Sequence, residues 1–233
     1  MRRSIPILPD SGLPDAAAQA HKGRGTALAV AHRFERQGRE AADDGWPPDE
    51  PGDVPASEGS APRTELREEQ VGSLLTRNDS PDIPFEQALN PYRGCEHGCI
   101  YCYARPTHAY LDLSPGIDFE TRLVAKVNAV QVLERELDAR AYRPSPIAIV
   151  SVTDAYQPVE RRLGITRGVL ELLGRTRHPY TVITKSAGIE RDIDLLAEAA
   201  AARRALAALS ITTLDPALAR ILEPRAASPQ RRL

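Results

Sequence analysis

Three cysteines within eight residues carry the most specific chemical signal in this chain of 233 residues. Cys95, Cys99 and Cys102 have the spacing C-x3-C-x2-C, and Gly94 and Gly98 allow the loop to fold back so that the thiols approach one another. An odd number of closely spaced cysteines is not typical of a disulfide framework, but it is typical of a metal site. The spacing therefore predicts that the three thiolates bind one metal group.

Two kinds of metal group are compatible with this trio. Iron-sulfur clusters are usually held by four thiolates, so three would leave one iron of a 4Fe-4S cluster with an open, reactive position. The competing interpretation is a zinc-stabilised binding module whose fourth ligand is His97 or His108. Zinc ligands usually come as two separated pairs, so a single trio favours the iron-sulfur cluster. An electron-transfer ferredoxin is disfavoured because it needs a fourth thiolate.

Polar side chains follow three of the strands that the sequence predicts. In parallel α/β folds, ligands bind at the carboxyl ends of the strands. A carboxylate there can accept hydrogen bonds from an ammonium group, and a lysine can pair with a carboxylate or phosphate. The same residue types also suit turn caps, solvated loops and strand ends. A binding role and a purely structural role are therefore both compatible with the sequence. The candidates are Thr153, Asp154, Lys185, Ser186, Ser210 and Thr212.

The elements that would position these residues are read from hydrophobic periodicity. Short apolar runs predict strands over 88–91, 147–152, 180–184 and 205–212. Apolar residues at steps of three and four predict amphipathic helices over 119–137, 159–173 and 189–200. Strands that alternate with helices at intervals of about thirty residues are typical of βαβ units with parallel strands.

The order of elements predicts an α/β fold in two parts. Residues 85–233 form the core, which we expect to be a partial (β/α) barrel of about four βα units, because a complete barrel needs about 250 residues. Ser228 and Pro229 are typical of the start of a helix, so we expect the core to be C-terminally truncated. Residues 1–84 hold ten of the twenty prolines and eight of the fifteen glycines, which predicts a mostly irregular extension. Within it, residues 26–36 could form one marginal helix or dock on the core.

The cysteine loop and its flanks resemble a known family. The stretch NPYRGCEHGCIYCYAR, with Tyr101 directly before the third cysteine, resembles the signature of the radical S-adenosylmethionine enzymes. The flanking sequence is similar to an uncharacterised bacterial subgroup grouped with spore photoproduct lyase-like, or DNA repair photolyase-like, proteins. The resemblance runs from about Lys22 to the end of the chain.

The resemblance implies a 4Fe-4S cluster held by the three cysteines, with S-adenosyl-L-methionine chelating the open iron. Reductive cleavage would then release methionine and a 5'-deoxyadenosyl radical, for lyase-like or other radical chemistry on an unknown substrate. The expected cofactor-binding residues are Tyr101, Thr153, Asp154, Lys185, Ser186, Ser210 and Thr212, and no catalytic residue is identified. Members of the family often hold the amino group of the cofactor with a Gly-Gly-Glu motif, which this sequence lacks, so Thr153 and Asp154 are the candidates for that role.

Composition limits the partners and the location. Thirty basic and thirty-two acidic side chains give a net charge of -2, so nothing global indicates a nucleic-acid or membrane partner. A nucleic-acid partner is suggested only by analogy with the family. The expected partner is a flavodoxin- or ferredoxin-like reductant protein. No apolar run reaches membrane-spanning length, which favours a cytoplasmic protein. A non-catalytic fragment that keeps the cluster loop is a further alternative.

Overall fold

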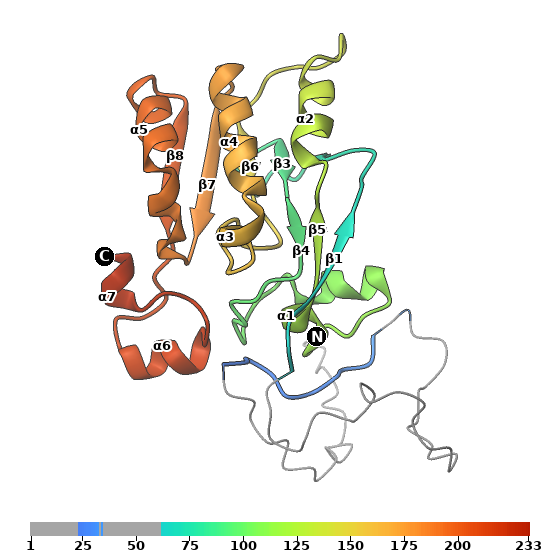
Figure 1. The fold of residues 1–233 in the computed structure, drawn as a ribbon, viewed down its shortest axis with the longest axis vertical. Coiled ribbons are helices and arrows are strands. Elements are labelled where there is room, and N and C mark those ends of the chain that lie inside the picture. The colour runs from blue at the N-terminus through green and yellow to red at the C-terminus, as the bar shows by residue number, and fades with distance from the viewer. Residues whose placement is uncertain (1–22, 33, 35–61) are drawn as a thin grey trace, which may run out of the picture.

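The computed structural model describes residues 23–32, 34 and 62–233, and these form a mixed α/β structure with two sheets (Figure 1). Much of the predicted extension over 1–84 therefore lies outside the described residues. In the described part of the chain, no helix has both the length and the apolar character that a membrane crossing requires.

The larger sheet has five strands in the order β2-β3-β6-β7-β8. Neighbouring strands from β3 to β8 are parallel, as the βαβ pattern predicts, and β2 is antiparallel to β3. The prediction for 180–184 is confirmed at both ends, whereas the strands predicted over 147–152 and 205–212 stop three residues earlier. The strands are β2 (Leu75–Arg77), β3 (Gln87–Leu89), β6 (Ile147–Ile149), β7 (Tyr180–Thr184) and β8 (Ala205–Leu209).

The smaller sheet corrects the prediction of one helix over 119–137. Helix α1 (Asp118–Thr121) is a single turn, and strand β5 (Arg122–Lys126) follows it directly. β5 lies between β1 (Glu65–Glu69), to which it is parallel, and β4 (Tyr92–Arg93), to which it is antiparallel. Four consecutive residues of β5 are buried, so the strand is covered on both faces, and a helical period there was coincidental. β1 and β2 both lie within the range predicted to be mostly irregular.

Three helices pack as a layer against one face of the five-stranded sheet (Figure 1). Helix α4 (Ile165–Arg175) lies between α2 (Ala129–Leu137) and α5 (Ile193–Ala201), and their apolar side chains form the main core with the strands. The helix predicted over 159–173 is divided into α3 (Glu160–Leu163) and α4 because Gly164, with φ 64°, ends the first and begins the second. The helix predicted over 189–200 likewise begins with the 3₁₀ turn η2 (Ala187–Asp192).

The remaining elements lie at the carboxyl end of the parallel strands (Figure 1). They are the 3₁₀ helix η1 (Arg105–Leu111), α6 (Pro216–Leu222) and α7 (Pro229–Arg232). Ser228 and Pro229 begin α7, as their types predict. Part of the segment 26–36 lies outside the described residues, and residues 23–32 contain no helix. They dock instead, since Leu28 accepts a hydrogen bond from Ile117 and Val30 bonds to the Ser114 hydroxyl in both directions.

Candidate functional site

The cysteine loop leaves β4 and turns sharply at two glycines. Gly94 and Gly98 have φ angles of 77° and 68°, a conformation that costs a residue with a Cβ atom about 1–2 kcal/mol. A Cβ at Gly98 would also lie 2.7 Å from the Glu120 carboxylate. Both glycines therefore allow the loop to turn back, and the convergence of the three thiols on one metal group stays a prediction. The Cys95 amide donates to the Phe119 carbonyl at 2.9 Å, which ties the loop to the end of α1.

Hydrogen bonds from Arg105, which is itself paired with Glu120, hold the cysteine loop in place. The Arg105 guanidinium donates to the Cys99 carbonyl at 3.0 and 2.9 Å, and to the Glu120 carboxylate at 2.6 Å. Glu120 is fully buried, and its second oxygen accepts from the Gly25 amide at 2.9 Å. Gly25 lies so close to the Gly98 carbonyl that any side chain there would collide with it. The segment 23–32 thus packs directly on the cysteine loop.

All three cysteines line one cavity of about 290 Å³ at the carboxyl ends of β6 and β7. Small-molecule sites are concave, mostly apolar and of about this size or larger. In the described residues no three side chains of the His, Cys, Asp or Glu type already stand in a metal-binding arrangement. The donor set nevertheless suits an iron-sulfur cluster, because the three cysteines line the same cavity. The other lining residues are His97, Tyr101, Tyr103, Ala104, Val150, Ser151, Val152, Thr153, Asp154, Ile183, Thr184, Lys185 and Ser210.

Burial keeps the thiols of Cys95 and Cys99 neutral when no metal is bound. It raises the pKa of Cys95 well above the usual value and raises the pKa of Cys99 to about 12, and nearby carboxylates add to both increases. A metal ion must therefore displace protons from both thiols, which couples its binding to pH. Of the two histidines considered as zinc ligands, His97 lines the cavity, whereas the fully buried His108 contacts the Arg122 carbonyl at 2.9 Å.

A strained bend after β6 forms one wall of the cavity. Val150 has a φ of 66°, which is unfavourable for a β-branched residue and occurs where surrounding contacts impose it. Asn90 supplies those contacts, because its side-chain oxygen accepts from the amides of Ser151 and Val152 at 2.8 and 3.0 Å. The bend turns the following residues toward the cysteines. Thr153 then donates to the Gly94 carbonyl at 2.6 Å.

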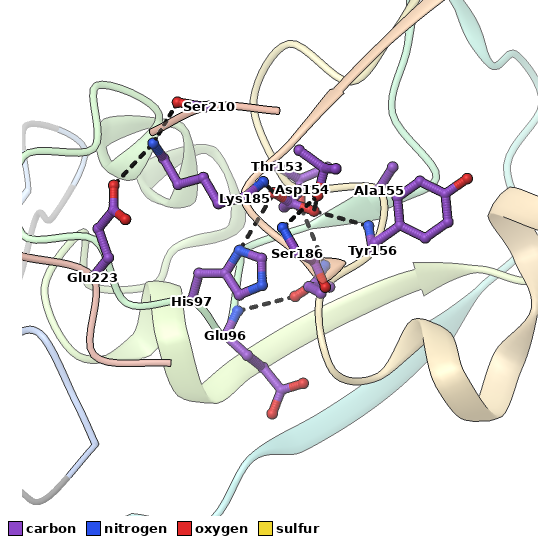
Figure 2. Close-up of polar contacts among 12 residues, drawn as sticks. Glu96, His97, Thr153, Asp154, Ala155, Tyr156, Lys185, Ser186, Ser210 and Glu223 are labelled. Atoms are coloured by element: carbon purple, nitrogen blue, oxygen red, sulfur yellow. Dashed lines mark hydrogen bonds and ion pairs between the residues drawn. The ribbon is translucent and has the colours of Figure 1, made fainter. Parts of the chain in front are cut away.

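Asp154 connects the ends of β6 and β7 (Figure 2). One oxygen accepts from the Tyr156 amide at 2.9 Å and the Thr184 hydroxyl at 2.6 Å, and the other accepts from the Lys185 amide at 2.9 Å. Burial opposes ionisation, but the nearby His97 ring and these hydrogen bonds lower the pKa of Asp154 below its usual value. His97 Nδ1 lies 3.3 Å from the carboxylate. The carboxylate is therefore ionised and already well supplied with donors.

The side chain of Lys185 extends away from Asp154 toward Glu223 and Ser210 (Figure 2). Its ammonium group is 2.7 Å from the Ser210 hydroxyl, 3.3 Å from the Thr212 hydroxyl and 2.9 Å from the Glu223 carboxylate. Burial disfavours the charged lysine, but the hydrogen bonds with Glu223 and Tyr101 raise its pKa above the usual value. Lys185 is therefore a fixed positive charge at the cavity wall.

The structure brings most of the predicted residues together. Tyr101, Thr153, Asp154, Lys185 and Ser210 line the same cavity as the cysteines. Thr212 is not among the lining residues, although it contacts Tyr101 at 2.8 Å. Ser186 lines a neighbouring cavity of about 390 Å³ on the far side of His97. Its hydroxyl accepts from the Gly188 amide at 3.0 Å and caps η2, so the structure gives Ser186 a capping role. None of these contacts tests cofactor binding, and the assignments stay predictions.

Two contributors to the site were not identified from the sequence. Asn90 precedes the cysteines by five residues, and its role depends on a bend sixty residues later in the chain. Glu223 follows α6 and reaches Lys185 only through the tertiary fold. The Asn-Pro pair at 90–91 is a turn signal that could have drawn attention to Asn90. Nothing local in the sequence distinguishes Glu223 from other glutamates.

Comparison with known proteins identifies similar folds but does not establish an activity. No protein-family model matches the chain. It is 41% identical over 151 residues to an uncharacterised protein of Mycobacterium tuberculosis, covering 65% of this chain and 44% of that protein. It is 27% identical over 145 residues to an uncharacterised protein of Methanocaldococcus jannaschii, covering 62% and 51%. The chain thus spans about half the length of the curated relatives it matches.

Among solved structures, the chain is similar to a spore photoproduct lyase variant with bound AdoMet and a dinucleoside spore photoproduct. The TM-score is 0.50 with 18% sequence identity, and the match covers 72% of this chain and 44% of that chain. The fold is therefore a mixed α/β structure that resembles a portion of spore photoproduct lyase. At this level of identity the likeness concerns the fold alone.

Proposed function

We propose that this chain is a radical S-adenosylmethionine iron-sulfur protein, in which Cys95, Cys99 and Cys102 hold a 4Fe-4S cluster. One observation carries the proposal: the three thiols of a C-x3-C-x2-C loop line a single cavity at the carboxyl ends of parallel strands. The likeness of the fold to a portion of a lyase that binds AdoMet supports it. In this proposal, the five-stranded sheet is the wall of a partial (β/α) barrel.

The chain's own residues would bind and orient the cofactor. When bound, the cluster would supply the electron that cleaves the sulfonium of S-adenosyl-L-methionine to methionine and a 5'-deoxyadenosyl radical. Lys185 and Ser210 present a cation and a hydroxyl suited to the carboxylate of the cofactor. Val150 and Val152, which form an apolar part of the cavity wall, would exclude water from the reacting atoms.

The amino group of the cofactor has two candidate partners in the cavity wall. Asp154 and Thr153 have the right chemistry and line the cavity, but each already makes intramolecular hydrogen bonds. We assign no substrate, because the photoproduct belongs to a neighbour with which only the fold is shared. The electron requires an external one-electron donor, for which a flavodoxin- or ferredoxin-like protein is suited.

The experiment is anaerobic purification followed by iron and sulfide analysis, and then addition of dithionite and S-adenosyl-L-methionine. The proposal predicts a brown protein that is bleached by reductant and that releases 5'-deoxyadenosine. A colourless protein with about one zinc per chain would instead support a zinc-stabilised binding module. A cluster without release of 5'-deoxyadenosine would support a non-catalytic fragment.

A further inference from the structure

Three oxygens hold the Lys185 ammonium group in this structure, and the contact with the Thr212 hydroxyl, at 3.3 Å, is the longest and is the one that a ligand carboxylate would replace. An ammonium group has three donors, and here three oxygens surround it, from Ser210, Thr212 and Glu223. The group also lies 5.6 Å from the centre of the Tyr101 ring, within range of a cation–π interaction. A flexible four-carbon side chain is thereby held in one position at the cavity wall.

Glu223 is the centre of this arrangement, and it is itself anchored. Its carboxylate accepts from Lys185, from the Thr212 hydroxyl at 2.5 Å and from the Tyr101 hydroxyl. Its second oxygen accepts from Arg232 at 2.5 Å, and both side chains of that ion pair are 1% exposed. Arg232 also donates to the Ser210 carbonyl at 2.7 Å. The pair is therefore fixed to the segment that follows β8.

The position of Glu223 shows which role it can have. Lys185, Tyr101 and Ser210 line the cysteine cavity, whereas Glu223 and Arg232 do not. Glu223 thus lies behind Lys185 rather than in the cavity. One carboxylate between two cations leaves one net positive charge in the group, and the cation nearest the cavity is Lys185. One further carboxylate in the cavity would make the group neutral.

We propose that Glu223, fixed by Arg232, is a positioning residue that aims Lys185 at the carboxylate of the bound cofactor. This rests on the proposed function, because it takes the ligand to be an S-adenosyl amino acid. Glu223 would favour binding of the cofactor carboxylate through entropy as well as through electrostatics. A lysine side chain loses about 2 kcal/mol of rotamer freedom when it is fixed, and Glu223 imposes that loss before the ligand arrives.

The experiment compares two ligands that differ in the amino-acid end. S-adenosylhomocysteine carries the carboxylate, and 5'-methylthioadenosine lacks the whole amino-acid group. The affinity of each is measured by anaerobic titration calorimetry on the cluster-loaded protein, and the ratio of the two dissociation constants is the readout. The variants are Glu223→Gln, Lys185→Met and the double variant. Glu190→Gln is the matched control, because Glu190 pairs with Arg231 of the same C-terminal segment without contacting Lys185.

The proposal predicts that Glu223→Gln lowers the preference for S-adenosylhomocysteine by about tenfold, the loss expected for one charge-assisted hydrogen bond. Affinity for 5'-methylthioadenosine should not change, and Glu190→Gln should behave like the wild type. In the Lys185→Met background, Glu223→Gln should have no further effect on the ratio, because it acts through Lys185.

An equal loss of affinity for both ligands in Glu223→Gln would overturn the proposal, and so would an unchanged ratio. If this variant does not fold because Arg232 is left unpaired, the double variant Glu223→Gln with Arg232→Met removes both buried charges and should give the same lowered ratio. Wild-type protein that binds neither ligand would overturn the proposed function itself, and this inference with it. A wild-type preference that survives in Glu223→Gln would overturn only the positioning role.

Discussion

At the scale of single residues, the site depends on carboxylates whose oxygens already have donors. Asp154 links the ends of two neighbouring strands, Glu120 holds the back of the cysteine loop, and Glu223 holds Lys185. Each is buried, so each must be paired to be stable as an anion. These carboxylates therefore hold the cavity wall in place. Only the hydrogen-bonding positions that they do not use within the protein can bind a ligand.

Asp154→Asn tests the linking role. The amide could still accept from Tyr156 and Thr184, but its NH₂ group would then face the Lys185 amide, which is also a donor. We expect a loss of about 1–3 kcal/mol in the free energy of unfolding, because a buried donor is left without an acceptor. The measurement is urea denaturation, with the exposed Asp79→Asn as the control. Equal midpoints for the two variants would contradict the assigned role.

Glu223 should make stability depend on pH in the acid range. Burial would raise its pKa, but hydrogen bonds from Thr212, Tyr101, Lys185 and Arg232 lower it to about 2, below the usual 4.5. A carboxyl group with a lowered pKa in the folded state stabilises the protein above its unfolded pKa, and this contribution is lost as the pH falls. The difference in unfolding free energy between wild type and Glu223→Gln should therefore shrink from pH 5 toward pH 2. A difference that stays constant across this range would refute the assignment.

At the scale of elements, the parallel strands could be predicted because their signal is local. The run 180–184 is apolar and β-branched, and it forms a strand with the predicted bounds. β5 was missed because a strand buried on both faces has no alternation, and its spacing also fits a helix. That the three cysteines line one cavity could be expected, because their spacing is contained within eight residues. The roles of Asn90 and Glu223 could not be expected, since their partners are distant in the sequence.

A glycine of the cysteine loop and a glycine of helix α4 should respond in opposite ways to substitution by alanine. Gly98→Ala should destabilise the protein by about 1–2 kcal/mol or more and lower its iron content, because φ is positive and the methyl group would meet Glu120. Gly174→Ala lies within α4 with open space around it and should stabilise the protein by about 0.5–1 kcal/mol. Thermal unfolding and iron analysis of both variants test this. Similar behaviour in the two would count against the proposed loop geometry.

At the scale of the whole molecule, the face of the sheet opposite the helices remains partly exposed. Ile183 on β7 and Leu206 on β8 lie on this face and are 50% and 58% exposed. Among the described residues, β8 pairs only with β7, so its other edge presents unpaired backbone groups. Exposed apolar edges of this kind favour association.

We therefore expect this chain to self-associate. Leu206→Thr should reduce the association while keeping the preference for a strand, because threonine is β-branched and less apolar. Sedimentation velocity at two protein concentrations measures the effect, with the half-buried Leu195→Thr of α5 as a comparison outside this face. A wild-type protein that sediments as a monomer at both concentrations would show that this edge does not drive association.

The central claim is that three cysteines bind a 4Fe-4S cluster whose remaining iron accepts S-adenosyl-L-methionine. The most direct measurement is iron and sulfide content, with electron paramagnetic resonance of the reduced protein before and after S-adenosyl-L-methionine is added. The account predicts about four irons and four sulfides per chain, a cluster signal altered by the cofactor, and loss of the cluster in Cys99→Ala. A full complement of iron in Cys99→Ala, or a signal that the cofactor leaves unchanged, would contradict it.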